Sequence, residues 1–285
     1  VAVAGPCEVA EVEKAPGGSS VRTRDCRAFS AARVVLAAGG QAGPQFGTDG
    51  SAFALARMLG HSVAEPYPCL VPLRCAGFPV GLKGVRANCA LSLYLDGRCA
   101  GTERGEVQFA EYGLSGIPAM QLSCLLGPGV KKAGTSVDFF PEMAFPVLRG
   151  MLEQRCASGM FAWLETLLLG LVAKKLGHAI LKSCGLQPLS RAPGSLSRRE
   201  VNALAGALKN WRFAVEGTLP WTQAQVTGGG VPLAEVKTEG CASLRCPGLY
   251  LSGEVLDAAG DCGGFNLQWA WATGIAAGRA AARGL

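Results

Sequence analysis

The stretch "GEVLDAAGDCGGFNLQWAWATGIAAG", residues 253–278, decides the fold of this chain. Two acids, Glu254 and Asp257, close an apolar run that begins at residue 248, and glycines follow them at 260, 263 and 264. Glycine allows the main chain to turn sharply or to approach a ligand closely. The alanine- and glycine-rich residues from 267 to 283 are typical of a tightly packed helix. The order of strand, glycine turn and helix predicts a buried parallel strand that ends at a ligand crevice.

A second segment has the same order of elements. The run "RVVLAAGG" (33–40) is a short apolar strand that ends in two glycines, and a helix is predicted over 49–61. Ala52, Leu55, Ala56 and Leu59 lie at helical spacing, so one face of this helix is expected to be buried. The chain therefore has an α/β segment near each end.

The sequence pattern changes in the middle of the chain, which predicts a domain inserted between the two α/β segments. Alternating runs joined by Asp96-Gly97 predict an antiparallel hairpin, and residues 136–143 predict another strand followed by a turn. Helices are predicted over 145–157 and 161–185, and Ser197 with Glu200 forms a capping box for another. The expected organisation is a first α/β part at 1–66, an insert at 67–221 and a second α/β part at 222–285. Within the insert, residues 67–140 are β-rich and 141–210 are mainly helical.

Composition limits the classes of partner. The chain has 285 residues, 49% of them hydrophobic, and a net charge of +6. Its basic residues are scattered, so no nucleic-acid partner is predicted. The longest apolar stretch contains Glu165 and Lys174, which predicts that no segment spans a membrane. Twelve cysteines without zinc-ligand spacing predict no metal site and reduced, mostly buried thiols in a cytoplasmic protein. His61 and His178 are interpreted as structural residues.

Two glycine-rich loops each allow two interpretations. The loop with Gly39, Gly40, Gly43 and Gly47 either admits a bulky ligand or is a generic strand-to-helix connection. The stretch "TQAQVTGGGV" (222–231) either lines the same crevice or is a tight return from the insert. Sequence motifs of serine hydrolases, zinc proteases and P-loop proteins are absent. A ligand-binding α/β protein remains the best interpretation.

The motifs resemble a known family. The segments "VVLAAGGQAGPQFGTDGSAFALARMLGHSVAEPYPCLVPL", "RGEVQFAEYGLSGIPAMQLS" and "GLYLSGEVLDAAGDCGGFNLQWAWATGIAAG" are similar to bacterial NAD(P)/FAD-dependent oxidoreductases of the BaiN type. That family includes aminoacetone-oxidase-family flavoproteins and 3-dehydro-bile-acid Δ4,6-reductases. The resemblance covers essentially the whole chain.

The resemblance implies the fold, the cofactor and a set of site residues. The implied fold is α/β, with a Rossmann-like FAD-binding domain interrupted by an insert that has a β-barrel-like part and a helical part. The implied chemistry is reduction of a small organic or steroid-like substrate, with NADH or NADPH as a possible electron donor. The implied cofactor-binding residues are Gly39, Gly40, Gly47, Asp49, Gly253, Glu254, Asp257, Gly263, Gly264, Phe265, Asn266, Leu267 and Gln268.

Two departures from the family pattern shape the expectation. The family begins with a unit whose GxGxxG-like loop binds the FAD pyrophosphate, and this sequence lacks it, so an N-terminally incomplete domain is expected. Ser51 stands where the family usually has Asp. The alternative to an enzyme is a truncated or non-catalytic flavin- or nucleotide-binding module. Tyr112, Glu111 and Cys262 are weak candidates for an acid or base, so no catalytic residue is assigned.

Overall fold

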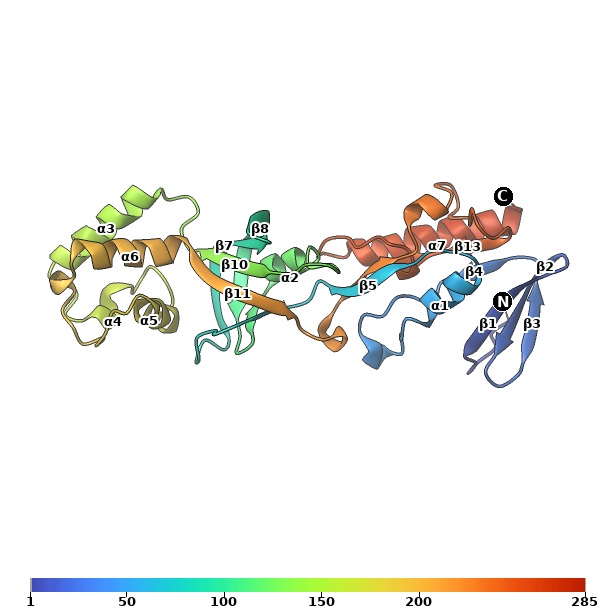
Figure 1. Cartoon of the computed structure of the whole chain (residues 1–285), viewed down its shortest axis with the longest axis horizontal. Helices are drawn as coiled ribbons and strands as arrows, with labels where there is room; N and C mark the ends of the chain where they lie inside the picture. Colours follow the sequence, from blue (N-terminus) through green and yellow to red (C-terminus); the bar gives the residue numbers. More distant parts are fainter. Residues whose placement is uncertain (1, 285) are drawn as a thin grey trace. The chain divides into compact units, whose positions relative to one another are not determined.

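The computed structural model describes residues 2–284 and divides the chain into two units (Figure 1). Unit 1 combines both ends of the sequence, Val1–Leu70 and Pro220–Leu285, and unit 2 is the intervening Val71–Leu219. Each unit has its own buried apolar core. The α/β segments near the two ends of the chain thus meet in one unit.

Unit 1 is built from short strands and two longer helices. Its strands are β1 (Val9–Ala15), β2 (Gly18–Thr23), β3 (Ala28–Ala31), β4 (Val34–Leu36), β5 (Ala64–Cys69), β12 (Val226–Gly230) and β13 (Leu249–Leu251). Its helices are α1 (Ser51–Met58) and α7 (Phe265–Arg283), with single 3-10 turns η1 (Pro44–Phe46), η3 (Trp221–Gln223), η4 (Leu233–Glu235) and η5 (Gly253–Val255).

The pairing of β4 with β13 brings the two α/β segments together. These strands are parallel, with Val34 opposite Leu249 and Leu36 opposite Leu251. Both therefore end at the same edge, where η5 follows β13. The predicted buried face of α1 is confirmed, because Ala52, Leu55, Ala56 and Leu59 are all buried. The three remaining strands near the N-terminus form the antiparallel sheet β1-β2-β3.

Unit 2 contains a closed six-stranded barrel and a helical part, as the sequence led us to expect. The barrel order is β10-β11-β6-β9-β8-β7. Its strands are β6 (Leu73–Cys75), β7 (Val85–Leu95), β8 (Arg98–Phe109), β9 (Gly113–Ser115), β10 (Ala133–Asp138) and β11 (Trp211–Thr218). The helices are α2 (Ile117–Ser123), α3 (Phe145–Ala157), α4 (Leu164–Leu167), α5 (Lys174–Ser183) and α6 (Arg198–Lys209), with η2 at Pro193–Ser195.

Local sequence signals explain several of these elements. Asp96 and Gly97 have φ of 49° and 84°, so both adopt the left-handed conformation that a two-residue hairpin turn between β7 and β8 requires. The capping box is confirmed: the Ser197 hydroxyl accepts from the Glu200 backbone N–H, and the Glu200 side chain accepts from the Ser197 backbone N–H. Helix α6 consequently begins at Arg198.

Three expectations need correction. The strand expected over 248–257 is only three residues long, because Gly253 adopts φ 75° and turns the chain into η5. The helix expected over 161–185 is divided into α4 and α5, and Gly170 at φ 79° lies in the break. The expectation of mostly buried thiols is wrong, because only five of the twelve cysteines are buried and Cys26 and Cys99 are exposed. Cys26 lies in the turn between β2 and β3, and Cys99 lies at the start of β8.

Candidate functional site

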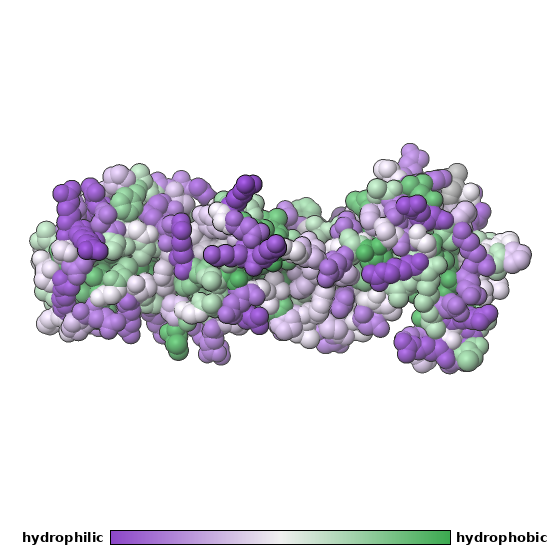
Figure 2. Space-filling view, in the orientation of Figure 1, coloured by the Kyte–Doolittle hydropathy of each residue, from purple (hydrophilic) through white to green (hydrophobic). Residues whose placement is uncertain are grey.

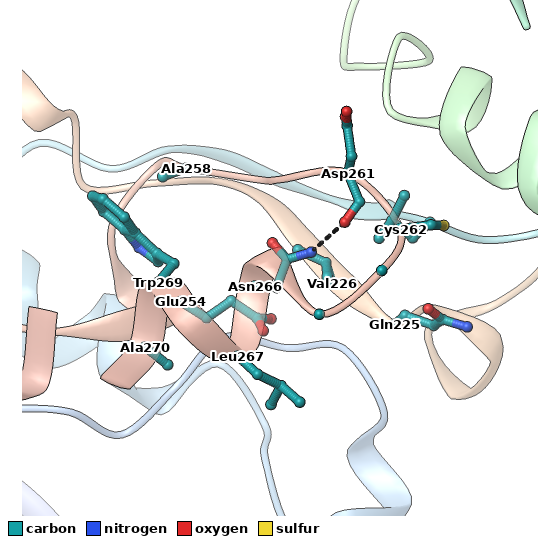
Figure 3. Close-up of a pocket in the computed structure, with 13 residues that line it drawn as sticks. Gln225, Val226, Glu254, Ala258, Asp261, Cys262, Asn266, Leu267, Trp269 and Ala270 are labelled. Carbon is teal, nitrogen blue, oxygen red and sulfur yellow. Dashed lines mark hydrogen bonds between the residues drawn. The ribbon is translucent and has the colours of Figure 1, made fainter. Parts of the chain in front are cut away.

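A cavity of about 250 Å³ lies in unit 1, beyond the carboxyl end of β13 (Figure 3). In open α/β sheets this is the edge where ligands bind. The cavity is formed by η5, the turn before α7, the first turns of α7 and the start of β12. Its lining residues are Leu70, Gln225, Val226, Glu254, Ala258, Asp261, Cys262, Gly263, Gly264, Asn266, Leu267, Trp269 and Ala270.

Glu254 is held in the cavity wall by a buried junction of three segments. Its Oε1 accepts a hydrogen bond from the backbone N–H of Thr227 at 2.9 Å. The Thr227 hydroxyl oxygen in turn accepts from the backbone N–H groups of Gln41 and Ala42, at 2.8 and 3.0 Å. The Thr227 side chain is completely buried. Residues far apart in the sequence thus fix the carboxylate before any ligand arrives.

Gly40 is required by this junction. A Cβ atom at this position would lie 2.5 Å from Glu254 Oε1 and 2.5 Å from Thr227 Oγ1. Both distances are far shorter than van der Waals contact, so any side chain would push the two groups apart. The glycine in the first loop therefore serves the packing around Glu254, which is a more specific role than a generic strand-to-helix connection.

The turn before α7 is locked by Asn266. Its Oδ1 accepts from the Gly260 backbone N–H at 2.8 Å, and its Nδ2 donates to the Gly260 carbonyl at 2.9 Å. Its Nδ2 also lies 3.4 Å from the Asp261 carbonyl oxygen, a hydrogen bond drawn in Figure 3. Asn266 is not the N-cap of α7. The N-cap is Gly264, whose φ of 94° lets the chain turn into the helix two residues earlier than expected.

Helix α7 presents its N-terminus to the cavity. The helix has 19 residues, and the first N–H groups of any α-helix lack partners within the helix, which favours negative charge there. Two side chains fix η5 against it. The Thr273 hydroxyl accepts from the Gly253 N–H at 3.0 Å, and Trp269 Nε1 donates to the Gly253 carbonyl at 3.3 Å. The cavity thus combines a fixed carboxylate with the positive end of a helix dipole.

The structure places the predicted site residues in three groups. Five of them line the cavity together: Glu254, Gly263, Gly264, Asn266 and Leu267. Four others surround it without lining it: Gly40 contacts Glu254, Gly253 is buried in η5, and Phe265 and Gln268 are exposed on the first turn of α7. The remaining four, Gly39, Gly47, Asp49 and Asp257, do not line it.

Asp49 and Asp257 have local roles. Asp49 Oδ1 accepts from the Ser51 N–H at 2.9 Å at the start of α1, and hydrogen bonding from Ser51 lowers the pKa of Asp49. The backbone N–H of Asp257 donates to the Val231 carbonyl at 2.8 Å, while its side chain is exposed. Neither carboxylate lines the cavity.

Sequence reasoning missed Thr227 and Trp269 as site residues. Thr227 immediately precedes three glycines, and this glycine run is the feature of the sequence that could have indicated a site residue here. The glycines themselves do not line the cavity, whereas Gln225 and Val226 just before them do. Cβ atoms at Gly228 and Gly230 would lie 2.5 Å from the Tyr67 ring and 2.7 Å from the Val255 carbonyl, so these glycines permit close packing of β12.

A second polar cluster, away from the cavity lining, contains His61, Glu235 and Ser243. His61 Nδ1 lies 2.8 Å from Glu235 Oε2, and Nε2 lies 2.7 Å from Ser243 Oγ. The Ser243 oxygen also accepts from the backbone N–H groups of Arg245 and Cys246, at 3.0 and 2.7 Å. Its proton therefore goes to Nε2, and Nδ1–H donates to Glu235.

This cluster resembles a serine hydrolase triad in its residue types only. Both lone pairs of the Ser243 oxygen are occupied by backbone N–H groups, so the hydroxyl is not available as a nucleophile. Burial acts to raise the pKa of Glu235, but hydrogen bonds from Ser62, His61 and Arg245 outweigh it and bring the pKa to about 2. The cluster therefore joins the end of α1 to η4 and to the loop before β13, and His61 is a structural residue.

Other candidate features give no competing site. Among residues 2–284, no group of three or more His, Cys, Asp or Glu side chains could hold a metal ion. Within the same range, no helix has the length and apolarity needed to cross a bilayer. Burial raises the pKa of the Cys75 and Cys89 thiols to about 12, so neither is a reactive thiolate at neutral pH.

Comparison with known proteins supports the Rossmann-like part of the predicted fold class. A family model described as the HI0933-like protein Rossmann domain matches residues 1–280. The chain is 38% identical over 263 residues to a 3-dehydro-bile acid delta(4,6)-reductase of Clostridium scindens, which covers 90% of this chain and 64% of the reductase.

More distant relatives have a different named activity. The chain is 26% identical to a ribosomal RNA dihydrouridine synthase of Haemophilus influenzae, over 94% of this chain and 66% of that protein. It is 29% identical to a ribosomal RNA dihydrouridine synthase of Escherichia coli, over 85% of this chain and 58% of that protein. The chain thus spans less than two thirds of the length of each of these relatives.

Proposed function

The chain belongs to the family of HI0933-like Rossmann proteins, and from this premise we propose that it is an FAD-dependent oxidoreductase. The proposed reaction is the reduction of a small organic or steroid-like substrate, with NADH or NADPH as electron donor. The observation that carries the proposal is the cavity at the carboxyl end of β13, where a fixed Glu254 carboxylate and the N-terminus of α7 converge.

The residues around the cavity fit the flavin end of FAD. Gly263 and Gly264 carry no side chain, and a Cβ at Gly264 would meet nothing within 4 Å, so this wall can accept a flat ring. The volume of about 250 Å³ lies below the roughly 300–1,000 Å³ typical of complete ligand pockets. The cavity therefore suits part of a dinucleotide, and the sequence has no GxGxxG loop for the pyrophosphate.

Each residue has a defined task in this proposal. Bound flavin supplies hydride transfer, which no amino-acid side chain provides. Glu254 would accept a hydrogen bond from a hydroxyl of the ribityl chain. The N-terminal amides of α7 would stabilise negative charge on the ring by about 1–2 kcal/mol. Asn266 fixes the turn between Gly260 and Gly264, which forms one wall of the cavity, and Trp269 holds η5 against the helix.

A matched pair of variants tests the location of the flavin. Ala270 lines the cavity, whereas Ala272 is exposed on the same helix and does not. The variants are compared in a chimera that joins this chain to the part of the Clostridium scindens reductase that it does not span. We expect Ala270→Leu to lower FAD retention at least tenfold and Ala272→Leu to leave it unchanged. Equal FAD content in both variants would show that the flavin binds elsewhere.

A second candidate function, reduction of a uracil base in RNA, is favoured by one observation. Unit 2 carries 17 of the 27 Lys and Arg residues but only 10 of the 21 Asp and Glu residues, a net charge of +7. Unit 1 carries the other 10 Lys and Arg residues and the other 11 Asp and Glu residues, a net charge of −1. Charge segregation of this kind is typical of proteins that bind nucleic acid. The discriminating assay is anaerobic turnover of the flavin-loaded chimera with uridine-containing RNA against turnover with a steroid enone.

A further inference from the structure

Ion pairing leaves ten of the seventeen Lys and Arg residues of unit 2 to carry its net positive charge. Seven of its acids pair with seven of its Lys and Arg residues within 4 Å. The other ten cations form no salt bridge among the described residues, and only three acids are left to offset them. The position of those ten cations therefore decides where a polyanion would be attracted.

Four of the ten gather at one corner of the barrel together with an aromatic ring. We call this surface the barrel-corner patch, and its members are Tyr94, Arg98, Lys131, Lys132 and Arg212. The four cationic residues are exposed and Tyr94 is half-buried. In the space-filling view, hydrophilic side chains project over the β7–β8 region (Figure 2).

Strand register and backbone hydrogen bonds place Tyr94, Arg98 and Lys132 close together. Tyr94 on β7 pairs with Gly134 on β10, and Arg98 pairs with Leu95 across the β7–β8 turn. The backbone of Lys132 is bonded to Asp96 in that turn: the Asp96 N–H donates to the Lys132 carbonyl at 2.8 Å, and the Lys132 N–H donates to Asp96 Oδ1 at 3.2 Å. With the charge of Asp96 counted beside the four cations, this surface has a net charge of +3.

The patch also offers a stacking surface. The Arg212 guanidinium lies 5.8 Å from the centroid of the Tyr94 ring, and its Nε donates to Asn210 Oδ1 at 3.1 Å. The residue opposite Tyr94 on β10 is Gly134, so no side chain from that strand position covers the ring. Bases of single-stranded nucleic acid stack on aromatic rings and guanidinium planes, while lysines and arginines contact the phosphates.

We propose that the barrel-corner patch is a docking surface for single-stranded RNA. Arg98, Lys131 and Lys132 contact phosphates, and Tyr94 with Arg212 stacks an unpaired base. The proposal rests on the second candidate function, since it describes how an RNA substrate would be held. It departs from the expectation drawn from the sequence, because the members of the patch are dispersed over more than a hundred residues and only folding brings them together.

The test measures RNA affinity of the chain itself, without flavin. A fluorescein-labelled oligouridylate is titrated by anisotropy between roughly 50 and 200 mM salt. We expect Lys131→Glu with Lys132→Glu to weaken binding at least tenfold and to lower the salt slope by about two. The matched control is Lys174→Glu with Lys175→Glu, which changes the charge equally at the start of α5. This control should change affinity less than threefold.

A separate variant tests whether an unpaired base stacks on Tyr94. Tyr94→Leu should weaken binding about tenfold without changing the salt slope, because stacking is worth roughly 1–3 kcal/mol per base and releases no counterions. Three results would overturn the proposal: no RNA binding at the lowest salt, equal losses in the two charge variants, or equally tight binding of phosphatidylserine vesicles. Because the RNA titration contains no flavin, its results do not bear on the flavin proposal. Likewise, loss of FAD from the chimera does not bear on the proposed RNA docking surface.

Discussion

Replacing Thr227 by valine should open the junction that holds Glu254. Valine has the shape of threonine, so the buried packing is retained while the acceptor for the Gln41 and Ala42 N–H groups is lost. Each partly buried amide left without a partner costs about 1–3 kcal/mol. For the two amides together we therefore expect a destabilisation of about 2–6 kcal/mol, which corresponds to roughly 30- to 20,000-fold faster exchange of these amides.

Hydrogen exchange followed by mass spectrometry measures this effect at the peptide that contains residues 41 and 42. Thr227→Ser is the control, because it keeps the hydroxyl oxygen and loses one buried methyl, which costs about 1 kcal/mol. The serine variant should therefore exchange more slowly than the valine variant. If valine left the exchange unchanged, or if serine were the more damaging substitution, the hydroxyl would not be the group that holds the loop.

Three further predictions concern packing, pH and thiol reactivity. Gly40→Ala should destabilise the chain by about 1–3 kcal/mol in urea unfolding because of the overlap in the junction, whereas Gly278→Ala, in open space on α7, should stabilise it by about 0.5–1 kcal/mol. The pKa of Glu235 is about 2 in the folded chain, so its ionised side chain contributes fully to the free energy of unfolding above the unfolded pKa of about 4.3. As the pH falls from 5 to 2, the free energy of unfolding should therefore decrease by on the order of 2–3 kcal/mol. The Glu235→Gln variant should lack this part of the decrease. Iodoacetamide at neutral pH should label the exposed Cys99 at least tenfold faster than Cys75, whose pKa is raised to about 12 by burial, and equal rates would contradict the buried placement of Cys75.

The parts of the fold that depend on local chemistry could be predicted from the sequence. The hairpin turn at Asp96-Gly97, the capping box at Ser197 and the helix over 145–157 follow from backbone preferences of neighbouring residues. The buried strands β4 and β13 were implied, each by itself, by an apolar run that ends in glycines or acids. Such signals extend over only a few residues, which is why they are readable without coordinates.

The parts that depend on long-range contacts could not be predicted. The role of Thr227 depends on a bond to residues 185 and 186 positions away. Gly40 resembles any loop glycine until the positions of Glu254 and Thr227 are known. The strand ending at Leu251 and the N-cap at Gly264 depend on where individual glycines adopt positive φ, which the sequence permits but does not require.

The central claim is that the cavity beside Glu254 and α7 holds the flavin of an oxidoreductase. The most direct measurement is the visible absorption spectrum of the desalted chimera with the Clostridium scindens segment, before and after anaerobic addition of NADH or NADPH. The proposal predicts a flavin band that bleaches with one of the two donors and that is lost in Ala270→Leu but retained in Ala272→Leu. A colourless chimera that also fails to take up added FAD would contradict it.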